Sequence, residues 1–413
     1  MFLLTLFKIA ARNVLRNRRR SAITLLGIGL GLTLIIFFQG LISGMDKQIT
    51  DNFIKAQAGH IQLYAQGYTE KSRLLPLDIA LAESEDLLEA VKDTPGVEGV
   101  SPRIRFRAIL SLGSENTGVM ALAIRPEAER STGVIANSIM EGGSYLDDQL
   151  GYVLVGKQLA EDLKLRVGSV PLLVGTTASG GLNAGRFEVK GIFYTGYPQY
   201  DGSMIVIHLA GAQRLLGLAG KITEIAVSLR DVDWTDQTAA LLTERLADDG
   251  VELQTWKETG AAIWQTLTFR RWLLSVISFI VIAIAMLGMA NTMLMAVFER
   301  TREIGTMMAL GATRPQLLTL FVLEGQLIGA AGGLLGGFLG GSLIKYLSVV
   351  GISPPSSISS VLSAPIGNVI YAEFSWGWIL IFFVFAQLVS MLAAIYPAYL
   401  ASKQEPVTAL RHI

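Results

Sequence analysis

Residues 272–298 read WLLSVISFIVIAIAMLGMANTMLMAVF, a run of 27 residues without Asp, Glu, Lys or Arg. A helix needs about 20 consecutive apolar residues to cross the hydrocarbon core of a bilayer. Three further runs, 21–45, 325–344 and 374–402, lack charged residues in the same way. Only 16% of the 413 residues are charged, whereas soluble proteins carry about 25%. The sequence therefore predicts an integral membrane α-helical protein with four transmembrane helices.

A large external α/β domain is expected between helices 1 and 2, because residues 46–271 are long enough to bury a core of their own. The predicted segments, in chain order, are a cytoplasmic amphipathic helix (1–20), the first span (21–45), the external domain (46–271), the second span (272–298), a cytoplasmic helix (299–316), the third span (317–345), a short external loop (346–375), the fourth span (376–400) and a cytoplasmic tail (401–413).

The distribution of charge gives the orientation, because short cytoplasmic flanks of membrane helices hold an excess of Lys and Arg. Residues 1–20 contain six basic residues and no acidic one. We therefore expect both termini in the cytoplasm. The block 46–271 has 22 basic and 29 acidic residues, a net charge of −7, and the rest of the chain has 12 and 5, a net charge of +7. Arg270 and Arg271 go against this rule, which long translocated domains weaken.

The first span reads as an uncleaved anchor. Its apolar run exceeds the roughly 7–15 residues of a signal peptide. The preceding stretch, LFKIAARNVLRNRRR (6–20), alternates apolar and basic positions at helical spacing, so it is expected to lie along the inner leaflet. Its arginines would face anionic headgroups or simply anchor the topology. They are Arg12, Arg16, Arg18, Arg19 and Arg20.

The external domain shows one pattern twice, at its two ends. Strand-like GHIQLYA (59–65), a helical segment (82–94) and the extended stretch 97–112 follow one another. The same order returns in 222–230, 234–249 and 251–256. Two such units predict one ferredoxin-like layer. Residues from about 113 to 221, richer in strand and Gly, are expected to form an inserted subdomain.

No catalytic constellation stands out. GYVLVGKQ (151–158) matches G-x-x-x-x-G-K, but Gln158 replaces the Ser or Thr that would hold Mg²⁺, and the intervening residues favour a strand that enters a helix. The chain has no cysteine, and His60, His208 and His412 are scattered. We expect no catalytic, metal or cofactor site in this chain, and no nucleic-acid partner.

The third span contains GAAGGLLGGFLGG (329–341). Glycines spaced four apart let another helix approach closely, either within one bundle or across a dimer. Those on one face are Gly329, Gly333, Gly337 and Gly341. Glu324 lies near the start of the same span. Two interpretations are open for this carboxylate: a position at the cytoplasmic boundary of the membrane, or a role in transport.

ERTREIGTMMALGAT (299–313) is a charged interruption between two apolar segments. The spacing predicts ion pairs between Glu299 and Arg302 and between Arg300 and Glu303. Ile304, Met307 and Met308 would remain as an apolar contact set, and Gly311 would end the helix. A solvated turn and a docking helix both fit this pattern.

Three stretches resemble the permease subunits of MacB/FtsX-type (type VII) ABC transporters. They are RNVLRNRRRSAITLLGIGLG (12–31), ERTREIGTMMALGATRPQLLTLFVLEG (299–325) and YPAYLASKQEPVTALR (396–411). The external segments GHIQLY, GVEGVSPRI and LVGKQLAEDLKLRVGS are most similar to the LolC/LolE-like lipoprotein-releasing group. The resemblance implies that 299–316 is a coupling helix for an ATPase. Its implied contact residues are Glu299, Arg300, Arg302, Glu303, Ile304, Gly305, Met308, Leu310, Gly311 and Ala312.

The resemblance also implies the partners. The chain shows no nucleotide-binding domain, so ATP and Mg²⁺ would be bound by a separate cytoplasmic ABC ATPase. A second copy or a paralogous permease would complete a dimer in a bacterial inner membrane. The substrate would be a lipoprotein or another amphiphile, with a periplasmic chaperone or a membrane-fusion protein as outer partner. MacB-like efflux of drugs or peptides and FtsX-like signalling to an envelope hydrolase are the alternatives; a membrane-bound enzyme is a distant one.

Overall fold

The computed structural model describes residues 2–55, 59–140, 142–196, 198–247, 249–353 and 369–403. The chain forms two compact units, which we describe separately. The membrane unit comprises the chain up to residue 46, residues 267–352 and the chain from residue 370; the external domain comprises residues 47–266. Residues 404–413 of the expected tail and 354–368 of the expected outer loop lie outside the described residues.

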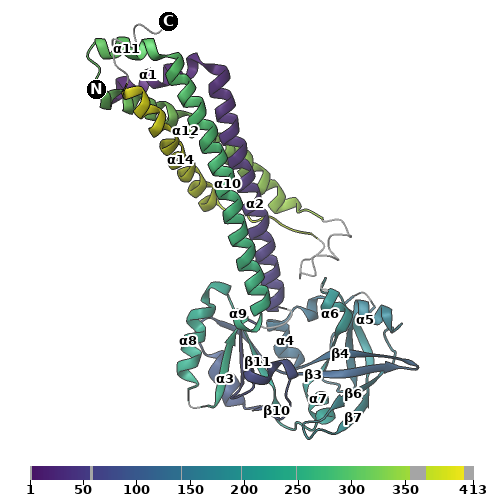
Figure 1. Ribbon diagram of the computed structural model, residues 1–413. Coiled ribbons are helices and arrows are strands. Elements are labelled where there is room, and N and C mark those ends of the chain that lie inside the picture. Colours follow the sequence, from purple (N-terminus) through teal and green to yellow (C-terminus); the bar gives the residue numbers. More distant parts are fainter. Residues whose placement is uncertain are drawn as a thin grey trace. The chain divides into compact units, whose positions relative to one another are not determined.

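Helices build the membrane unit (Figure 1). They are α1 (Phe2–Arg16), α2 (Arg18–Phe53), α10 (Ala261–Glu299), α11 (Thr301–Ala309), α12 (Arg314–Val350) and α14 (Trp376–Ser402). Four of them, α2, α10, α12 and α14, are long and apolar enough to cross a membrane. The prediction of four membrane helices with a large domain between the first two is confirmed.

These helices are longer than the spans expected from hydropathy. The α2 helix has 36 residues, about 54 Å at 1.5 Å per residue, whereas the hydrocarbon core is about 30 Å thick. Residues 346–350, expected in a loop, belong to α12, and residues 261–271, expected in the external domain, belong to α10. Hydropathy marks only the apolar part of a helix, because polar residues at either end continue the backbone hydrogen bonding equally well.

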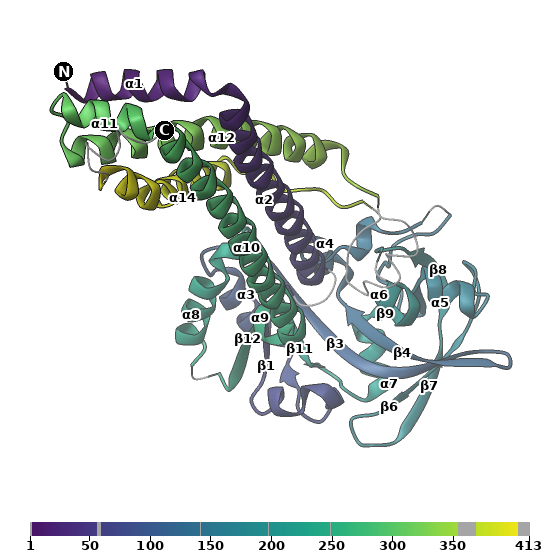
Figure 2. The ribbon, with the colours of Figure 1, turned by 45° about the horizontal axis from the view of Figure 1, so that its top comes forward.

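The N-terminal segment is two helices rather than the single helix expected over residues 1–20. A turn at Asn17 separates α1 from α2. Leu6 and Ala10 of α1 pack against Leu320 of α12, whereas Leu4 and Leu15 are exposed. Figure 2 shows α1 beside α11 and α12. The α1 helix thus has one apolar side on the protein and another free for the bilayer interface.

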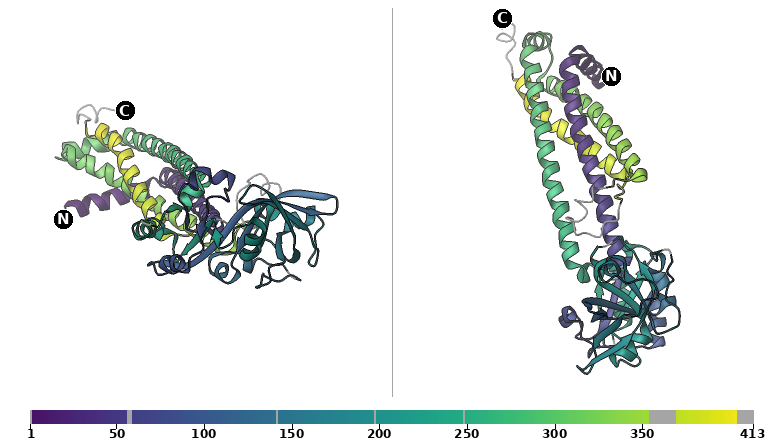
Figure 3. Two further views of the ribbon diagram at one scale, coloured as in Figure 1. Left: turned by 90° about the horizontal axis from the view of Figure 1, so that it is seen from below. Right: turned by 90° about the vertical axis from the view of Figure 1, so that its right-hand side faces the viewer.

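Glycines let α12 pack closely against two neighbouring helices. A Cβ at Gly333 would lie 2.9 Å from the Phe383 ring of α14, and one at Gly336 would lie 2.6 Å from the carbonyl oxygen of Gly29 in α2. The four glycines singled out in the sequence face α14: Gly329 meets Ser390, Gly333 meets Phe383, and Gly337 and Gly341 meet Ile379. Packing within one bundle is therefore the role the structure describes for them. Figure 3 shows these helices from two further sides.

The external domain contains the expected ferredoxin-like layer. Its elements are β1 (Ile61–Ala65), α3 (Glu85–Lys92), β3 (Val97–Leu112), β11 (Glu224–Leu229), α8 (Thr235–Arg245) and β12 (Val251–Thr255). The strand order is β12-β1-β11-β3, with each neighbouring pair antiparallel. This is the order in which two βαβ units interleave, so the prediction is confirmed.

The segment from about 113 to 221 continues the same sheet. Its strands are β4 (Glu115–Ile124), β5 (Tyr152–Gly156), β6 (Leu172–Thr176), β7 (Leu182–Arg186), β8 (Glu188–Phe193) and β9 (Met204–His208). The order continues β3-β4-β9-β5-β8, and β6 joins β3 to β7. Because β3 is 16 residues long, one strand serves both halves of the ten-stranded sheet.

Short elements complete the external domain. The helices are α4 (Pro126–Thr132), α5 (Lys157–Asp162), α6 (Pro198–Ser203), α7 (Leu209–Leu216) and α9 (Trp256–Thr259), with 3-10 turns η2 (Thr69–Leu74), η3 (Ile135–Asn137) and η4 (Val232–Trp234). A separate pair joins β2 (Leu81–Ala82) to β10 (Lys221–Ile222).

The two halves of the sheet differ in what they bury. Successive residues of β9 point to opposite apolar clusters, Ile205 to one and Val206 to the other. In the ferredoxin-like half, one face of β3 is polar. Arg103 donates to both carboxylate oxygens of Glu129 in α4, at 2.9 and 2.7 Å, and both side chains are almost fully buried. An ion pair thus occupies a place where apolar side chains would ordinarily pack.

His60 makes the stability of the external domain depend on pH. Its Nδ1 accepts a hydrogen bond from the Leu229 N–H at 3.0 Å. Burial lowers the pKa of His60 to about 4, whereas an unfolded chain has a His pKa near 6.5. As the pH falls below that value, the unfolded state binds a proton that the folded state does not, so stability decreases.

We expect the external domain to lose about 1 kcal/mol of unfolding free energy through His60 between pH 7.5 and 5.5. Urea unfolding of residues 47–266 at the two pH values measures it. His60→Asn should remove this part of the loss, because Asn keeps an acceptor and does not titrate. His208, whose pKa burial also lowers, remains in both proteins and cancels from the comparison. An equal pH dependence in both would contradict the assignment.

Candidate functional site: the corner between α10 and α11

A sharp corner separates α10 from α11. Arg300 lies between the two helices with φ −109° and ψ 17°, which interrupts the helical backbone. At the other end, Gly311 has φ +98°, and its N–H donates to the Met308 carbonyl at 3.0 Å. The prediction that Gly311 ends the helix is confirmed. The helix predicted over residues 299–316 covers only Thr301–Ala309 in the structure. Arg314 already begins α12, after a capping box formed by Thr313 and Gln316.

The apolar side of α11 faces inward. Ile304 is fully buried and packs in a cluster with Val297 and Phe321. The expectation that Ile304 offers an outward contact is therefore wrong, since the hydrophobic side of a nine-residue helix is used to hold it in place. Gly305 is also buried, and Met307, Met308 and Ala312 are half-buried. The outward residues are Arg302, Glu303, Thr306, Ala309, Leu310 and Gly311.

Leu310 is the most exposed large hydrophobic side chain of the described residues, at 84%. It lies directly after α11, beside Gly311. A single exposed leucine is common on protein surfaces, but this one lies at the tip of a turn held from both sides by helices. The corner thus presents one apolar side chain among polar ones.

Charged side chains join the corner to other helices. Arg300 pairs with Glu303 at 2.9 Å, as the spacing predicted. Glu299 does not pair with Arg302. Its carboxylate accepts instead from Arg20 of α2, with Nη1–Oε2 at 2.7 Å. The prediction failed because the chain turns at Arg300, so Glu299 and Arg302 belong to different helices and the i,i+3 rule does not apply.

Glu324 is the residue that the sequence left undecided. It lies in α12, is 4% exposed, and accepts from Asn13 Nδ2 at 2.6 Å and from Arg300 Nη1 at 3.0 Å. Burying an unpaired carboxylate is costly, so a lone Glu in an apolar span was the signal that a partner exists. Sequence distance did not identify that partner, because Arg314 and Arg302 are both nearer in the chain than Arg300, which lies 24 residues from Glu324.

Glu303 forms ion pairs with two arginines, Arg16 and Arg300. Arg16 of α1 donates to its two carboxylate oxygens at 2.6 and 2.9 Å. Burial alone would raise the pKa of Glu303, but hydrogen bonds from Arg300 and Arg16 outweigh burial, so the pKa lies below its ordinary value. The carboxylate is therefore charged at neutral pH and links α11 to α1.

A polar cavity of about 240 Å³ lies beside this network. Its lining comes from α1, the start of α2, the end of α10, the corner residue Arg300, α11 and α12. It includes Asn13, Arg16, Arg20, Glu299, Arg300, Glu303 and Glu324. The three arginines balance the three glutamates. The network is thus not surrounded by tight packing on this side.

The five N-terminal arginines divide into two groups. Arg16 and Arg20 form the ion pairs with Glu303 and Glu299. Arg12, Arg18 and Arg19 are exposed. Their contact with membrane headgroups stays a prediction, and it now concerns these three rather than all five.

A second ion cluster explains the two arginines that contradicted the charge rule. Asp46 of α2 is almost fully buried and pairs with Arg270, and also with Arg271 at 3.0 Å. Arg270 and Arg271 lie in α10. Their charges are thus partly neutralised within the membrane unit, where they tie α10 to α2.

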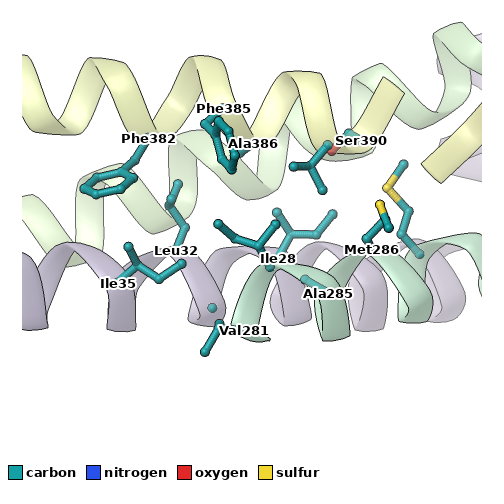
Figure 4. A pocket seen from close by; sticks show the side chains of 14 residues that line it. Ile28, Leu32, Ile35, Val281, Ala285, Met286, Phe382, Phe385, Ala386 and Ser390 are labelled. Atoms are coloured by element: carbon teal, nitrogen blue, oxygen red, sulfur yellow. The ribbon is translucent and has the colours of Figure 1, made fainter. Parts of the chain in front are cut away.

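An apolar pocket of about 40 Å³ lies between α2, α10 and α14 (Figure 4). Ile28, Val281 and Phe385 contribute to it from the three helices. Ser390 supplies a hydroxyl at one end. The volume accommodates a few methylene groups rather than a whole acyl chain.

The P-loop-like stretch has the structure expected from its apolar residues. Tyr152–Gly156 form β5 and Lys157 begins α5. Lys157 lies 4.0 Å from Glu161 and stacks over the Tyr194 ring. The side chain is thus engaged with its neighbours on the domain surface.

Four membrane helices, an α/β domain between the first two and a short helix between the second and third define a multi-pass membrane protein with a large external domain. Residues 275–406 match the FtsX-like permease C-terminal family, and residues 21–245 match the MacB-like periplasmic core domain. The chain belongs to this MacB/FtsX family of ABC transporter permeases.

The relatives share modest identity over nearly the whole chain. The lipoprotein-releasing system transmembrane protein LolC of Xylella fastidiosa (strain Temecula1) is 25% identical, covering 96% of this chain and 97% of LolC. The uncharacterized ABC transporter permease YknZ of Bacillus subtilis is 24% identical over the full length of both. The macrolide export ATP-binding/permease protein MacB of Hyphomonas neptunium is 25% identical, and this chain spans 60% of its length.

Solved structures are similar only in part. The periplasmic region of MacB from Actinobacillus actinomycetemcomitans aligns with a TM-score of 0.35 and 12% identity, covering 49% of this chain and 91% of that region.

Proposed function

We propose that this chain is the permease subunit of an ABC transporter that releases lipoproteins, or another amphiphile, from the bacterial inner membrane. A separate cytoplasmic ATPase binds and hydrolyses ATP with Mg²⁺. Both termini and α11 face the cytoplasm, and the external domain faces the periplasm. Two copies, or this chain and a paralogous permease, form the transporter.

The observation that carries the proposal is the built corner at α11. The nine-residue helix α11 is anchored by Ile304 on its inner side and by the ion pair of Glu303 with Arg16 of α1, while Leu310 and Arg302 remain outward. At the corner before it, Glu299 pairs with Arg20 of α2 and Arg300 pairs with Glu324 of α12. Such a rigidly held, outward-facing element suits a joint that passes movement from an ATPase into the membrane helices. The segregation of charge along the chain supports the cytoplasmic placement of this corner.

The substrate class rests on the relatives. LolC, which matches over nearly its whole length, is named as part of a lipoprotein-releasing system. A lipoprotein is an amphiphile whose acyl chains lie in the membrane and whose protein part lies outside. A permease with a large external domain between its first two membrane helices has parts in both environments.

MacB-like export of drugs or peptides is the second candidate, favoured by the match of residues 21–245 to the MacB-like periplasmic core. Signalling to an envelope hydrolase is the third. Neighbouring genes separate them: a periplasmic lipoprotein chaperone supports release, a membrane-fusion protein supports export, and a secreted hydrolase supports signalling.

We expect the purified permease to co-purify with the ATPase encoded beside it, and a triacylated peptide to stimulate ATP hydrolysis by the complex in lipid nanodiscs. The same peptide without acyl chains is the control. Stimulation by the acylated peptide alone supports lipoprotein release. Neither binding nor stimulation by the acylated peptide would reject the lipoprotein substrate while leaving the permease class intact.

A further inference from the structure

Glu324 is a buried charge in an otherwise apolar stretch of α12. It is almost fully buried, and so are Phe321 and Ile328, one turn to either side. Removing a carboxylate from water is unfavourable unless charged partners and hydrogen bonds compensate. A residue of this kind therefore fixes the groups that neutralise it in definite positions.

The groups that Glu324 fixes belong to the corner and to α1. Arg300 Nη1 lies 3.0 and 3.3 Å from the two carboxylate oxygens, and Asn13 Nδ2 donates at 2.6 Å. Arg300 is the single residue between α10 and α11. Its Nε donates at the same time to Glu303 of α11 at 2.9 Å, and Arg16 of α1 holds Glu303 from the other side. One chain of charges thus runs from α12 through the corner to α11 and α1.

Geometry argues that this network orients α11. A helix of nine residues has little stability of its own, so tertiary contacts decide its position. Ile304, Met307 and Met308 pack against apolar clusters on its inner side. The cavity of about 240 Å³ beside the ion pairs leaves that side without close packing. On that side, directional hydrogen bonds hold the angle at the corner.

We propose that Glu324 is a positioning residue that sets the orientation of α11 against α12 by holding Arg300, and that α1 is tied into the same arrangement through Asn13 and Arg16. The role rests on the proposed function, in which α11 is the joint with the ATPase. Glu324 itself touches neither ATPase nor substrate in this role; it acts through Arg300.

A spin label tests the orientation directly, because the chain has no cysteine. Thr306→Cys places one label on the outward side of α11, and Leu334→Cys places one on an exposed side of α12. We expect Glu324→Gln in the full chain to raise the mobile fraction of the α11 label roughly tenfold, as the loss of a charge-assisted hydrogen bond would. The α12 label should not change.

Two matched variants complete the experiment. Gln326→Ala, also in α12, removes a hydrogen bond to the Gln387 carbonyl of α14 and should leave the α11 label unchanged. Glu324→Asp keeps the charge and should restore much of the order that Glu324→Gln removes. An α11 label that does not respond to Glu324→Gln would overturn the proposal, and so would equal mobilisation of both labels, which would mean that Glu324 only supports the bundle.

The wild-type complex separates this inference from the proposed function. If the ATPase does not co-purify with the wild-type chain, the proposed partner is wrong, yet the labels still decide the role of Glu324. If the ATPase binds, we also expect Glu324→Gln to lower acyl-peptide stimulation several-fold, with basal hydrolysis retained. Unchanged stimulation together with a rigid α11 label would refute the positioning role.

Discussion

Replacing Glu129 by Gln is expected to destabilise the external domain by about 3–5 kcal/mol. The change keeps the size of the side chain and removes its charge. Arg103, 1% exposed, would then remain as a buried cation without its counter-ion. Ser101, which donates to the same carboxylate at 2.7 Å, would also lose its charged acceptor. Urea unfolding of residues 47–266 at pH 7 measures the effect.

Two further variants give the prediction its controls. Glu127→Gln removes a carboxylate from the exposed side of the same helix, α4, and should change stability by less than about 0.5 kcal/mol. Replacing Arg103 and Glu129 together by Met should recover most of the loss, because no charge is then left buried. A loss below about 1 kcal/mol in Glu129→Gln would mean that water reaches the pair.

The sequence predicted those parts of the external fold that depend on local patterns. Alternation in residues 59–65 and a helical apolar face in 82–94 placed β1 and α3, and the same pattern near 222–256 placed β11, α8 and β12. Their interleaving then followed from the topology of two βαβ units. Nothing local indicated that β3 would carry the intervening strands in the same sheet, since that pairing joins residues far apart in the chain.

At the candidate site, too, the sequence predicted only contacts between residues close together in the chain. The i,i+3 rule found the pair between Arg300 and Glu303, because both lie within one helical turn. It assigned Glu299 to the wrong partner, since a one-residue break at Arg300 turns the chain away from a continuous helix. The true partner, Arg20, lies 279 residues away, and no spacing rule reaches that distance.

The glycine spacing predicted close helix packing but did not identify the helix that packs there. The four-residue spacing in 329–341 predicted close helix packing, and it fitted both a bundle and a dimer. The contacts of Gly333 with Phe383 and of Gly336 with Gly29 occur within the chain. Only the three-dimensional arrangement could show which helix lies against each face.

At Gly311, replacement by Val is expected to reduce ATP-driven activity of the reconstituted transporter by at least about tenfold. The backbone there has φ +98°, a region that costs an L-residue roughly 1–2 kcal/mol and a β-branched residue more. No atom lies within 4 Å of a Cβ built at Gly311, so crowding plays no part. The strain would be relieved by moving the turn, and with it Leu310.

Because the effect arises from backbone strain at positive φ, the Gly311 variants should differ in how much activity they lose. Gly311→Asn should be the mildest, because Asn tolerates positive φ best among residues with a side chain; Gly311→Ala should lie between Asn and Val. Gly288→Ala in α10 is the matched control, since a Cβ there also meets no atom within 4 Å and its φ is not positive. It should leave activity unchanged.

Three measurements on the same preparations separate coupling from folding. ATPase co-purification reports whether α11 still docks, acyl-peptide stimulation reports whether movement is transmitted, and urea unfolding of the external domain should be the same as in the wild type. We expect the first two to fall together in Gly311→Val, because the turn holds Leu310 in its outward position. Full activity in Gly311→Val, or an equal loss in Gly288→Ala, would show that the backbone at Gly311 does not set the position of the joint.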